Sequence, residues 1–229
     1  MTSLSEKANP YYLAGGTALS LFYLGHRASY DLDFFTQTID YSAADTILEH
    51  IQHSLSVTAQ LAAEQRRPEL VPMRVYHLQD PKTKENCKID FVQDPVRLLS
   101  APDRINGIDI LSKEDIYYRK IYTVSGASSE QNITGKDIRV GGRQEAKDFF
   151  DLYFLSTVFI PLSEFITRYA DFSMVEGLIY WYRTFDRTQM KTDLLELITA
   201  HTVDFREMDR HIHDEIQRLI REQIKEKEE

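Results

Sequence analysis

The fold of this chain is decided by the stretch YLAGGTALSLFYLGHRASYDLDFF, residues Tyr12–Phe35. An apolar run ends at Gly15 and Gly16, and the residues from Thr17 to Leu24 have the pattern of a short helix. The first amides of a helix have no partners inside it, so such an end attracts phosphate. The turn at Gly15, Gly16 and Thr17 is therefore a candidate phosphate-binding site.

Two aspartates follow this turn in a segment of strand composition, Tyr30 to Phe35. Side chains alternate between the two faces of a strand, so we expect Asp31 and Asp33 to share one face. Two adjacent carboxylates repel each other, and a hard cation such as Mg²⁺ relieves that repulsion. The alternative is the polar face of a half-buried strand, but the nearby glycine turn favours a site for metal-bound nucleotide.

A third carboxylate lies in the segment from Asn86 to Val92, which has the pattern of another strand with Lys88 and Asp90 on one face. In a two-metal site, one ion activates an attacking hydroxyl and the other holds a triphosphate, and three carboxylates are a natural minimum set of ligands. Asp90 could complete such a set, or it could be a solvated strand residue.

Three motifs carry a family resemblance: LAGGTAL (Leu13–Leu19), LGHR (Leu24–Arg27) and SYDLDFF (Ser29–Phe35). Together they resemble the signature of the AbiEii/AbiGii toxin family of nucleotidyltransferases, which are relatives of DNA polymerase beta. In that family the glycine turn and the Asp-x-Asp pair form the nucleotide and metal site. A later strand supplies the third aspartate, and Asp90 matches this position.

A second block also resembles this family. The segments Leu111–Ile121 and Arg143–Leu155 are similar to its lysine-containing helix and its Lys-Asp-x-x-Asp-Leu-Tyr helix. The resemblance implies that Lys120 and Asp148 are functional, with Asp151 as the alternative aspartate. Lys120 would neutralise charge on the phosphates, and Asp148 would orient it or help to deprotonate the acceptor.

Residues around the glycine turn leave alternatives open. The commoner nucleotidyltransferase signature has Gly-Ser, so a serine contact to phosphate would fall here to Thr17 or to the backbone. Arg27 could reach a triphosphate or form a salt bridge with Asp31 or Asp33. Ser29 could contact phosphate through its hydroxyl or serve as a turn residue.

The resemblance implies a Mg²⁺-dependent enzyme, with two ions, that moves a nucleoside monophosphate from a nucleoside triphosphate to an acceptor hydroxyl. It also implies the toxin of a bacterial toxin–antitoxin or phage-defence pair, with the tRNA 3′ end as acceptor and a cognate antitoxin as partner. The net charge of −9 favours a small-molecule or protein acceptor instead. A third alternative is a module of the same fold that binds nucleotide or a partner without chemistry.

Composition restricts the compartment. The chain has 229 residues, of which one is cysteine, so an intramolecular disulfide is excluded and a reducing cytoplasm is expected. No apolar stretch approaches the roughly 20 residues needed to span a bilayer, so we expect no membrane partner.

The predicted fold class is α+β: a nucleotidyltransferase mixed sheet with flanking helices in residues 1–111, followed by a C-terminal helical bundle in residues 112–229. Predicted strands are 30–35, 70–78, 86–92 and 105–111, and a turn at Asp80 and Pro81 predicts that 70–78 and 86–92 form an antiparallel hairpin. Capping boxes predict helices that begin at Ser42 and Ser112, and a loop is expected over 125–142. Further helices are predicted over 143–157, 162–169, 173–183, 191–201 and 204–225.

Overall fold

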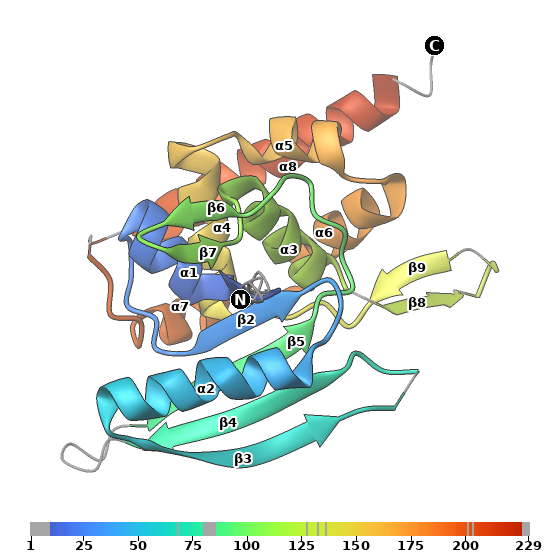
Figure 1. Cartoon of the computed structure of the whole chain (residues 1–229). Helices are drawn as coiled ribbons and strands as arrows, with labels where there is room; N and C mark the ends of the chain where they lie inside the picture. The colour runs from blue at the N-terminus through green and yellow to red at the C-terminus, as the bar shows by residue number, and fades with distance from the viewer. Residues whose placement is uncertain are drawn as a thin grey trace. The chain divides into compact units, whose positions relative to one another are not determined.

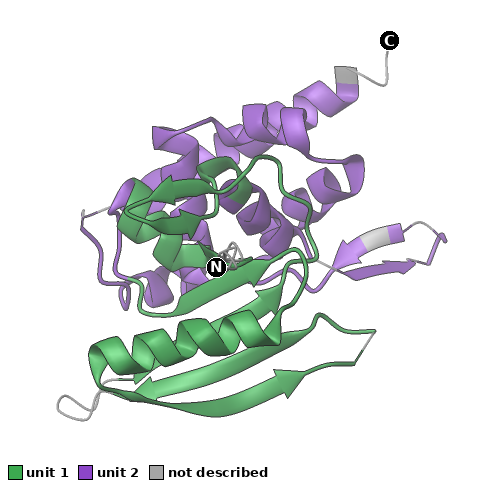
Figure 2. Cartoon of the chain, in the orientation of Figure 1, with its two compact units in different colours: residues 1–23, 29–115 green, residues 24–28, 116–229 purple. Residues whose placement is uncertain are grey.

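The computed structural model of the chain describes residues 10–67, 69–79, 86–126, 128–131, 133–135, 137–200, 202 and 204–225 (Figure 1). The chain forms two compact units (Figure 2). Unit 1 comprises residues 1–23 and 29–115, and unit 2 comprises residues 24–28 and 116–229. The division into two domains at residues 111 and 112 stays a prediction, because compact units are not by themselves independent domains.

Unit 1 is built on a mixed seven-stranded sheet with the strand order β3-β4-β5-β2-β1-β7-β6. Strand β2 runs parallel to β5 and antiparallel to β1, while β1 runs parallel to β7. The strands are β1 (Tyr12–Ala14), β2 (Leu32–Thr36), β3 (Thr58–Gln65), β4 (Met73–Gln79), β5 (Asn86–Gln93), β6 (Asp103–Ile105) and β7 (Ile108–Ile110). The predicted mixed sheet with flanking helices is confirmed.

One face of this sheet packs against helix α2 (Tyr41–Leu55), as Figure 1 shows. Ile89 and Phe91 are fully buried there, and Leu32 and Phe34 pack against the same cluster. Burying one such side chain contributes about 1.5–3 kcal/mol, and a slip of one residue would turn them all outward. Asp33 of β2 and Asp90 of β5 are thereby fixed on the opposite face.

The start of α2 differs from the prediction. Its N-cap is Asp40, whose carboxylate accepts hydrogen bonds from the amides of Ser42 (3.0 Å) and Ala43 (3.1 Å). The predicted capping box beginning at Ser42 is therefore wrong, because the chain already turns into the helix at Tyr41. At α3 (Lys113–Ser125) the capping box is confirmed, since the Ser112 hydroxyl accepts from the Asp115 amide at 3.1 Å.

The antiparallel pairing predicted between the strands 70–78 and 86–92 is confirmed in β4 and β5, although their turn at Asp80 and Pro81 lies outside the described residues. The single strand predicted over 105–111 is wrong, because this segment belongs to the β6–β7 hairpin. Strand β3 was not predicted.

Unit 2 is mainly helical, as predicted. After α3 its helices are α4 (Ala146–Val158), α5 (Leu162–Tyr169), α6 (Phe172–Thr184), α7 (Arg187–Leu194) and α8 (Phe205–Lys225). Helix α7 ends before most of the predicted range 191–201. The segment predicted as a loop contains an antiparallel ribbon of β8 (Ser128–Gln131) and β9 (Asp137–Val140), which Figure 1 shows extending from the helices of this unit.

Within the described part of the chain, no single helix is long and apolar enough to cross a membrane; α4 and α5 meet that requirement only together, across a bend of 93°.

Candidate active site

The glycine turn lies directly after β1, where Gly15 begins the short helix α1 (Gly15–Ala18) with φ of +69°. This helix continues as the π-helical segment η1 (Leu19–Leu24). The helix predicted from Thr17 to Leu24 therefore begins two residues earlier in the structure, at Gly15, and its second part is π-helical. A Cβ atom built on Gly15 would lie 2.0 Å from Oδ2 of Asp33. The backbone of the turn therefore packs directly against this carboxylate.

Thr17 is buried, and its hydroxyl donates to the carbonyl oxygen of Asp31. The Thr17 and Ser29 hydroxyls are also hydrogen-bonded, at 2.8 Å. Both side chains thus connect the turn to the segment that enters β2, which agrees with Ser29 as a turn residue. The Thr17 hydroxyl is therefore already engaged within the protein, and the contact of the turn with phosphate stays a prediction.

Asp33 and Asp90 lie opposite each other in the register of the parallel strands β2 and β5. Asp31 precedes β2 and is exposed; the strand predicted to begin at Tyr30 begins two residues later in the structure, at Leu32. Regular alternation therefore holds for Asp33 and Asp90, while Asp31 is placed by the turn that precedes the strand.

Nζ of Lys88 lies 2.6 Å from Oδ2 of Asp90. Burial lowers the pKa of Lys88, but the hydrogen bond and the charge of Asp90 outweigh this effect and raise it. The other oxygen, Oδ1 of Asp90, is buried and has no hydrogen-bond partner in the described part of the chain. Such an oxygen is an incomplete ligand that a cation would satisfy.

Among the described residues, there is no group of three or more His, Cys, Asp or Glu side chains arranged to hold a metal ion. The donor set nevertheless fits Mg²⁺, since Asp31, Asp33 and Asp90 offer only carboxylate oxygens and one of these is an orphaned buried atom. The residues present are therefore compatible with the expected ion.

In unit 2, Lys120 on α3 contacts both aspartates of α4. Its Nζ lies 2.9 Å from Oδ1 of Asp148 and 2.6 Å from Oδ2 of Asp151. Arg143 donates to both oxygens of Asp148, at 2.5 and 2.7 Å. The structure thus brings together the lysine and both candidate aspartates of the second block.

Arg27 binds Asp151 with its fork of donors, Nε at 2.7 Å and Nη2 at 2.8 Å. Nε2 of His26 lies 2.7 Å from the same carboxylate. From the sequence, Arg27 was expected to contact a triphosphate or to form a salt bridge with Asp31 or Asp33. In the structure its guanidinium pairs with Asp151 instead. His26 was not predicted as a site residue from the sequence; its position beside Arg27 was the available signal.

This buried cluster stays ionised over a wide pH range. Burial alone would raise the pKa values of Asp148 and Asp151, but Lys120 and the hydrogen bonds from neighbouring cations lower both. The two aspartates in turn raise the pKa of Lys120 despite its burial. Lys120, Arg27 and Arg143 therefore pair with the two buried carboxylates, and Arg143 also lies 3.8 Å from the carboxylate of Glu145.

Comparison with known proteins adds a family assignment. The whole chain, residues 1–229, matches the family model of the nucleotidyl transferase AbiEii toxin of type IV toxin–antitoxin systems. No curated protein sequence matches the chain significantly.

Two crystal structures from Helicobacter pylori are similar to this chain. One is JHP933, with a TM-score of 0.55 and 20% identity over 96% of this chain and 87% of the other. The second, described as a candidate nucleotidyltransferase, has a TM-score of 0.54 and 19% identity over 93% of this chain and 88% of the other. At these identities the similarity concerns the fold.

Proposed function

The chain belongs to the AbiEii family of nucleotidyltransferase toxins, and we propose that it uses Mg²⁺ to transfer a nucleoside monophosphate from a nucleoside triphosphate to an acceptor hydroxyl. The acceptor oxygen forms a bond to the α-phosphorus, and the bond from that phosphorus to the bridging oxygen breaks. Pyrophosphate leaves with the electron pair, and the hydroxyl proton passes to solvent.

One observation supports this proposal most strongly. Asp33 and Asp90 lie side by side on adjacent parallel strands, and the backbone at Gly15 packs directly against Asp33. A phosphate bound by the amides of the glycine turn would therefore be adjacent to carboxylates that can hold its counter-ions.

The chain's own residues then have separate roles in the proposal. Asp31, Asp33 and Asp90 hold two Mg²⁺ ions, which when bound neutralise the triphosphate and favour ionisation of the acceptor hydroxyl. The amides of Gly15, Gly16 and Thr17 orient the phosphates, while the hydroxyls of Thr17 and Ser29 hold the turn against the segment before β2.

For the second block we propose that Lys120 neutralises phosphate charge and that Asp148 positions it. Lys120 is buried and contacts Asp148 and Asp151, while Arg143 and Arg27 pair with the same two carboxylates, so these aspartates hold the lysine in its charged form. We propose that Arg27 does not contact phosphate directly. It positions Asp151, which in turn contacts Lys120.

The family assignment makes the chain a toxin nucleotidyltransferase of the type IV class. We propose the tRNA 3′ end as its acceptor and a cognate antitoxin protein as its partner. The net charge of −9 supports a second candidate, a protein or small-molecule hydroxyl, because nucleic-acid binders usually present a basic surface.

The deciding experiment measures incorporation of each α-labelled nucleoside triphosphate into total bacterial RNA with Mg²⁺. The native protein is compared with Asp33→Asn and with the control Glu49→Gln, which changes an exposed carboxylate on α2. We expect label in the tRNA band with the native protein and the control only.

Equal labelling by Asp33→Asn would overturn the mechanism. Label in protein or in small molecules would select the second acceptor class. Nucleotide binding without any transfer would instead indicate a non-catalytic binding module.

A further inference from the structure

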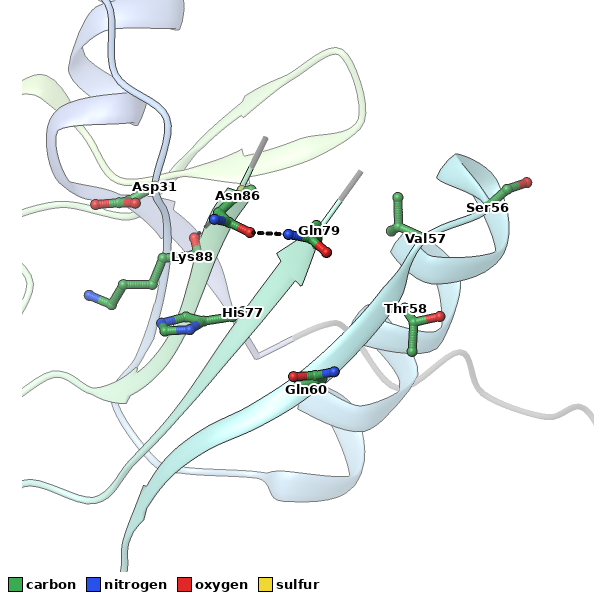
Figure 3. Close-up of a pocket in the computed structure, with 10 residues that line it drawn as sticks. Asp31, Ser56, Val57, Thr58, Gln60, His77, Gln79, Asn86 and Lys88 are labelled. Atoms are coloured by element: carbon green, nitrogen blue, oxygen red, sulfur yellow. Dashed lines mark hydrogen bonds between the residues drawn. The ribbon is translucent and has the colours of Figure 1, made fainter. Parts of the chain in front are cut away.

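A cavity of about 600 Å³ lies over strands β3, β4 and β5 of unit 1 (Figure 3). Its lining includes Asp31, Gln60, His77, Gln79, Asn86 and Lys88. This volume suits a ligand of nucleotide size, since small-molecule sites span roughly 300–1,000 Å³.

The polar side chains come from consecutive strands and form rows across the sheet. Gln60 lies opposite His77, and His77 lies opposite Lys88. In the next row Gln79 lies opposite Asn86 and donates to its side chain at 3.3 Å, the contact dashed in Figure 3. Directly opposed residues have Cβ atoms about 4.5–5.5 Å apart, so each row is a continuous polar surface.

The register also places these rows on the carboxylate face. Lys88 and Asp90 are two residues apart on β5 and form an ion pair. The intervening Ile89 is buried in the core on the other face. The cavity therefore continues the surface that carries Asp90.

The lining chemistry matches a nucleotide. Amide side chains such as Gln60 and Asn86 both donate and accept hydrogen bonds, which suits the edges of bases. His77 is an exposed imidazole that can stack on a base, and Lys88 supplies a cation for a phosphate. The whole chain has a net charge of −9, but Asp31 is the single carboxylate among the residues that line this cavity. The cavity is therefore less acidic than the chain as a whole.

The strand order places the cavity and the glycine turn on opposite sides of the carboxylates. The turn follows β1, the carboxylates lie on or just before β2 and on β5, and the cavity extends from β5 to β3. In phosphoryl transfer the attacking and leaving oxygens are roughly in line, on opposite sides of phosphorus. With the triphosphate at the glycine turn, the attacking hydroxyl approaches from the cavity side.

We propose that this cavity, named here the acceptor subsite (Gln60, His77, Gln79, Asn86 and Lys88), binds the terminal nucleotide of a single-stranded RNA acceptor. The inference rests on the proposed function, because it takes the glycine turn as the triphosphate site. Gln60 and Asn86 contact the base edge, His77 stacks against the base, and Lys88 faces a phosphate of the acceptor strand.

Binding is tested first without turnover or metal. The full chain, labelled at histidine, is titrated with each of the four ribonucleoside 5′-monophosphates, and the ring signals are followed by NMR. The His77 signal, assigned by its loss in His77→Ala, is expected to shift with at least one nucleotide, and less so in Gln60→Ala. The signal of His50, an exposed residue of α2, should stay unchanged.

An unmoved His77 signal, or an equal shift with inorganic phosphate alone, would overturn the proposal of a nucleotide subsite. This measurement needs no catalysis, so it stands apart from the proposed function. A native protein that shifts at His77 but labels no RNA would retain the subsite while the transferase proposal fails.

The kinetic test compares His77→Ala and Gln60→Ala with the control His50→Ala. Each subsite variant is expected to raise KM for the RNA acceptor about fivefold to tenfold, the equivalent of one lost hydrogen bond or stacking contact, with KM for the nucleoside triphosphate unchanged. An unchanged KM for RNA, or a rise in KM for the triphosphate alone, would contradict the assignment.

Discussion

Gly15 and Gly25 both have positive φ angles, +69° and +60°, yet their surroundings differ. A Cβ on Gly15 would meet the Asp33 carboxylate at 2.0 Å, whereas a Cβ on Gly25 would meet nothing within 4 Å. Left-handed backbone costs an ordinary residue about 1–2 kcal/mol in either place. Only at Gly15 does the substitution also displace a proposed metal ligand.

We therefore predict that Gly15→Ala loses nearly all nucleotidyl transfer, about 100-fold or more by analogy with other misplaced catalytic groups. Gly25→Ala should lose stability by about 1–2 kcal/mol and keep its activity. Label incorporation and urea unfolding of the two variants measure both quantities. Equal activity in the two variants would show that the approach of Gly15 to Asp33 is irrelevant to catalysis.

Lys88 competes with any cation for Asp90, because its Nζ already lies 2.6 Å from Oδ2. Removing this charge makes the carboxylate site more negative. We predict that Lys88→Met binds Mn²⁺, used as a probe for Mg²⁺, about threefold to tenfold more tightly, a gain appropriate to a partly solvated pair.

Titration followed by electron paramagnetic resonance measures this affinity directly. Lys88→Arg keeps the charge and serves as the control, with an affinity close to that of the native protein. Weaker Mn²⁺ binding in Lys88→Met would show that the lysine supports the metal site.

The candidate site could be predicted from sequence only where local periodicity determines position. Alternation along the predicted strand 86–92 correctly separated Asp90 from the buried Ile89 and Phe91, whereas the pairing of Asp90 with Asp33 is seen only in the structure. Alternation failed for Asp31, which precedes β2. The partner of Arg27 was not predictable either, because Asp151 is 124 residues away and charge alone does not select among carboxylates.

At the scale of elements, α3 and α4 are connected through buried charges. Asp148 and Asp151 are fully buried, and both contact Lys120. Loss of one partner from a buried ion pair typically costs about 3–5 kcal/mol, while an exposed pair contributes well under 1 kcal/mol. The stability of unit 2 therefore depends on these carboxylates more than on its surface charges.

We predict that Asp151→Asn lowers the free energy of unfolding by about 3 kcal/mol at pH 7. The pKa of Asp151 is lower in the folded chain than the roughly 3.9 of an unfolded aspartate. Its contribution is therefore complete above about pH 4 and is lost as the pH falls through the folded pKa. The difference between native and variant proteins should shrink under acidic conditions.

Urea unfolding between pH 7 and pH 3 tests this expectation. Glu164→Gln is the control, since it removes an exposed carboxylate paired with Arg168 within α5. Its effect should stay near 0.5 kcal/mol at any pH. A difference between native and Asp151→Asn proteins that does not vary with pH would contradict the role given to the Asp151 charge.

Elements with a clear pattern were predictable, and the others were not. Helix α5 has the predicted bounds because its apolar residues repeat at helical spacing. Strand β3 was missed because it is an edge strand with most of its residues exposed, so it lacks alternation of apolar side chains. Strand β8 is likewise polar and fully exposed, and its composition resembles that of a loop.

At the scale of the whole molecule, the two units are not separate in sequence. The segment Leu24–Ala28 belongs to unit 2, although the residues before and after it belong to unit 1. Its backbone is bound within unit 2, since the Ala28 amide donates to the Ile198 carbonyl at 2.7 Å and the Ala200 amide donates to the His26 carbonyl at 3.0 Å. The same five residues supply His26 and Arg27 to Asp151.

This connection has a consequence for the proposed site. The segment lies between the glycine turn and Asp31, which are the two parts of the phosphate and metal motif in sequence. Folding of unit 2 therefore fixes the conformation of the chain that joins them. A change at Asp151 or Lys120 can alter activity by this route as well as through direct chemistry, so stability must be measured beside activity in every such variant.

The predicted domain 112–229 can be tested on the same basis. We predict that a fragment of these residues does not fold cooperatively, because it lacks His26, Arg27 and the backbone bonds of Leu24–Ala28, and so leaves Asp151 with fewer cations. Circular dichroism during thermal unfolding measures cooperativity. Since a fragment can fail for other reasons, Arg27→Met in the full chain provides a second measurement, with an expected loss of about 3 kcal/mol. A fragment that unfolds as cooperatively as the full chain, together with an unaffected Arg27→Met variant, would show that residues 112–229 are a self-sufficient domain.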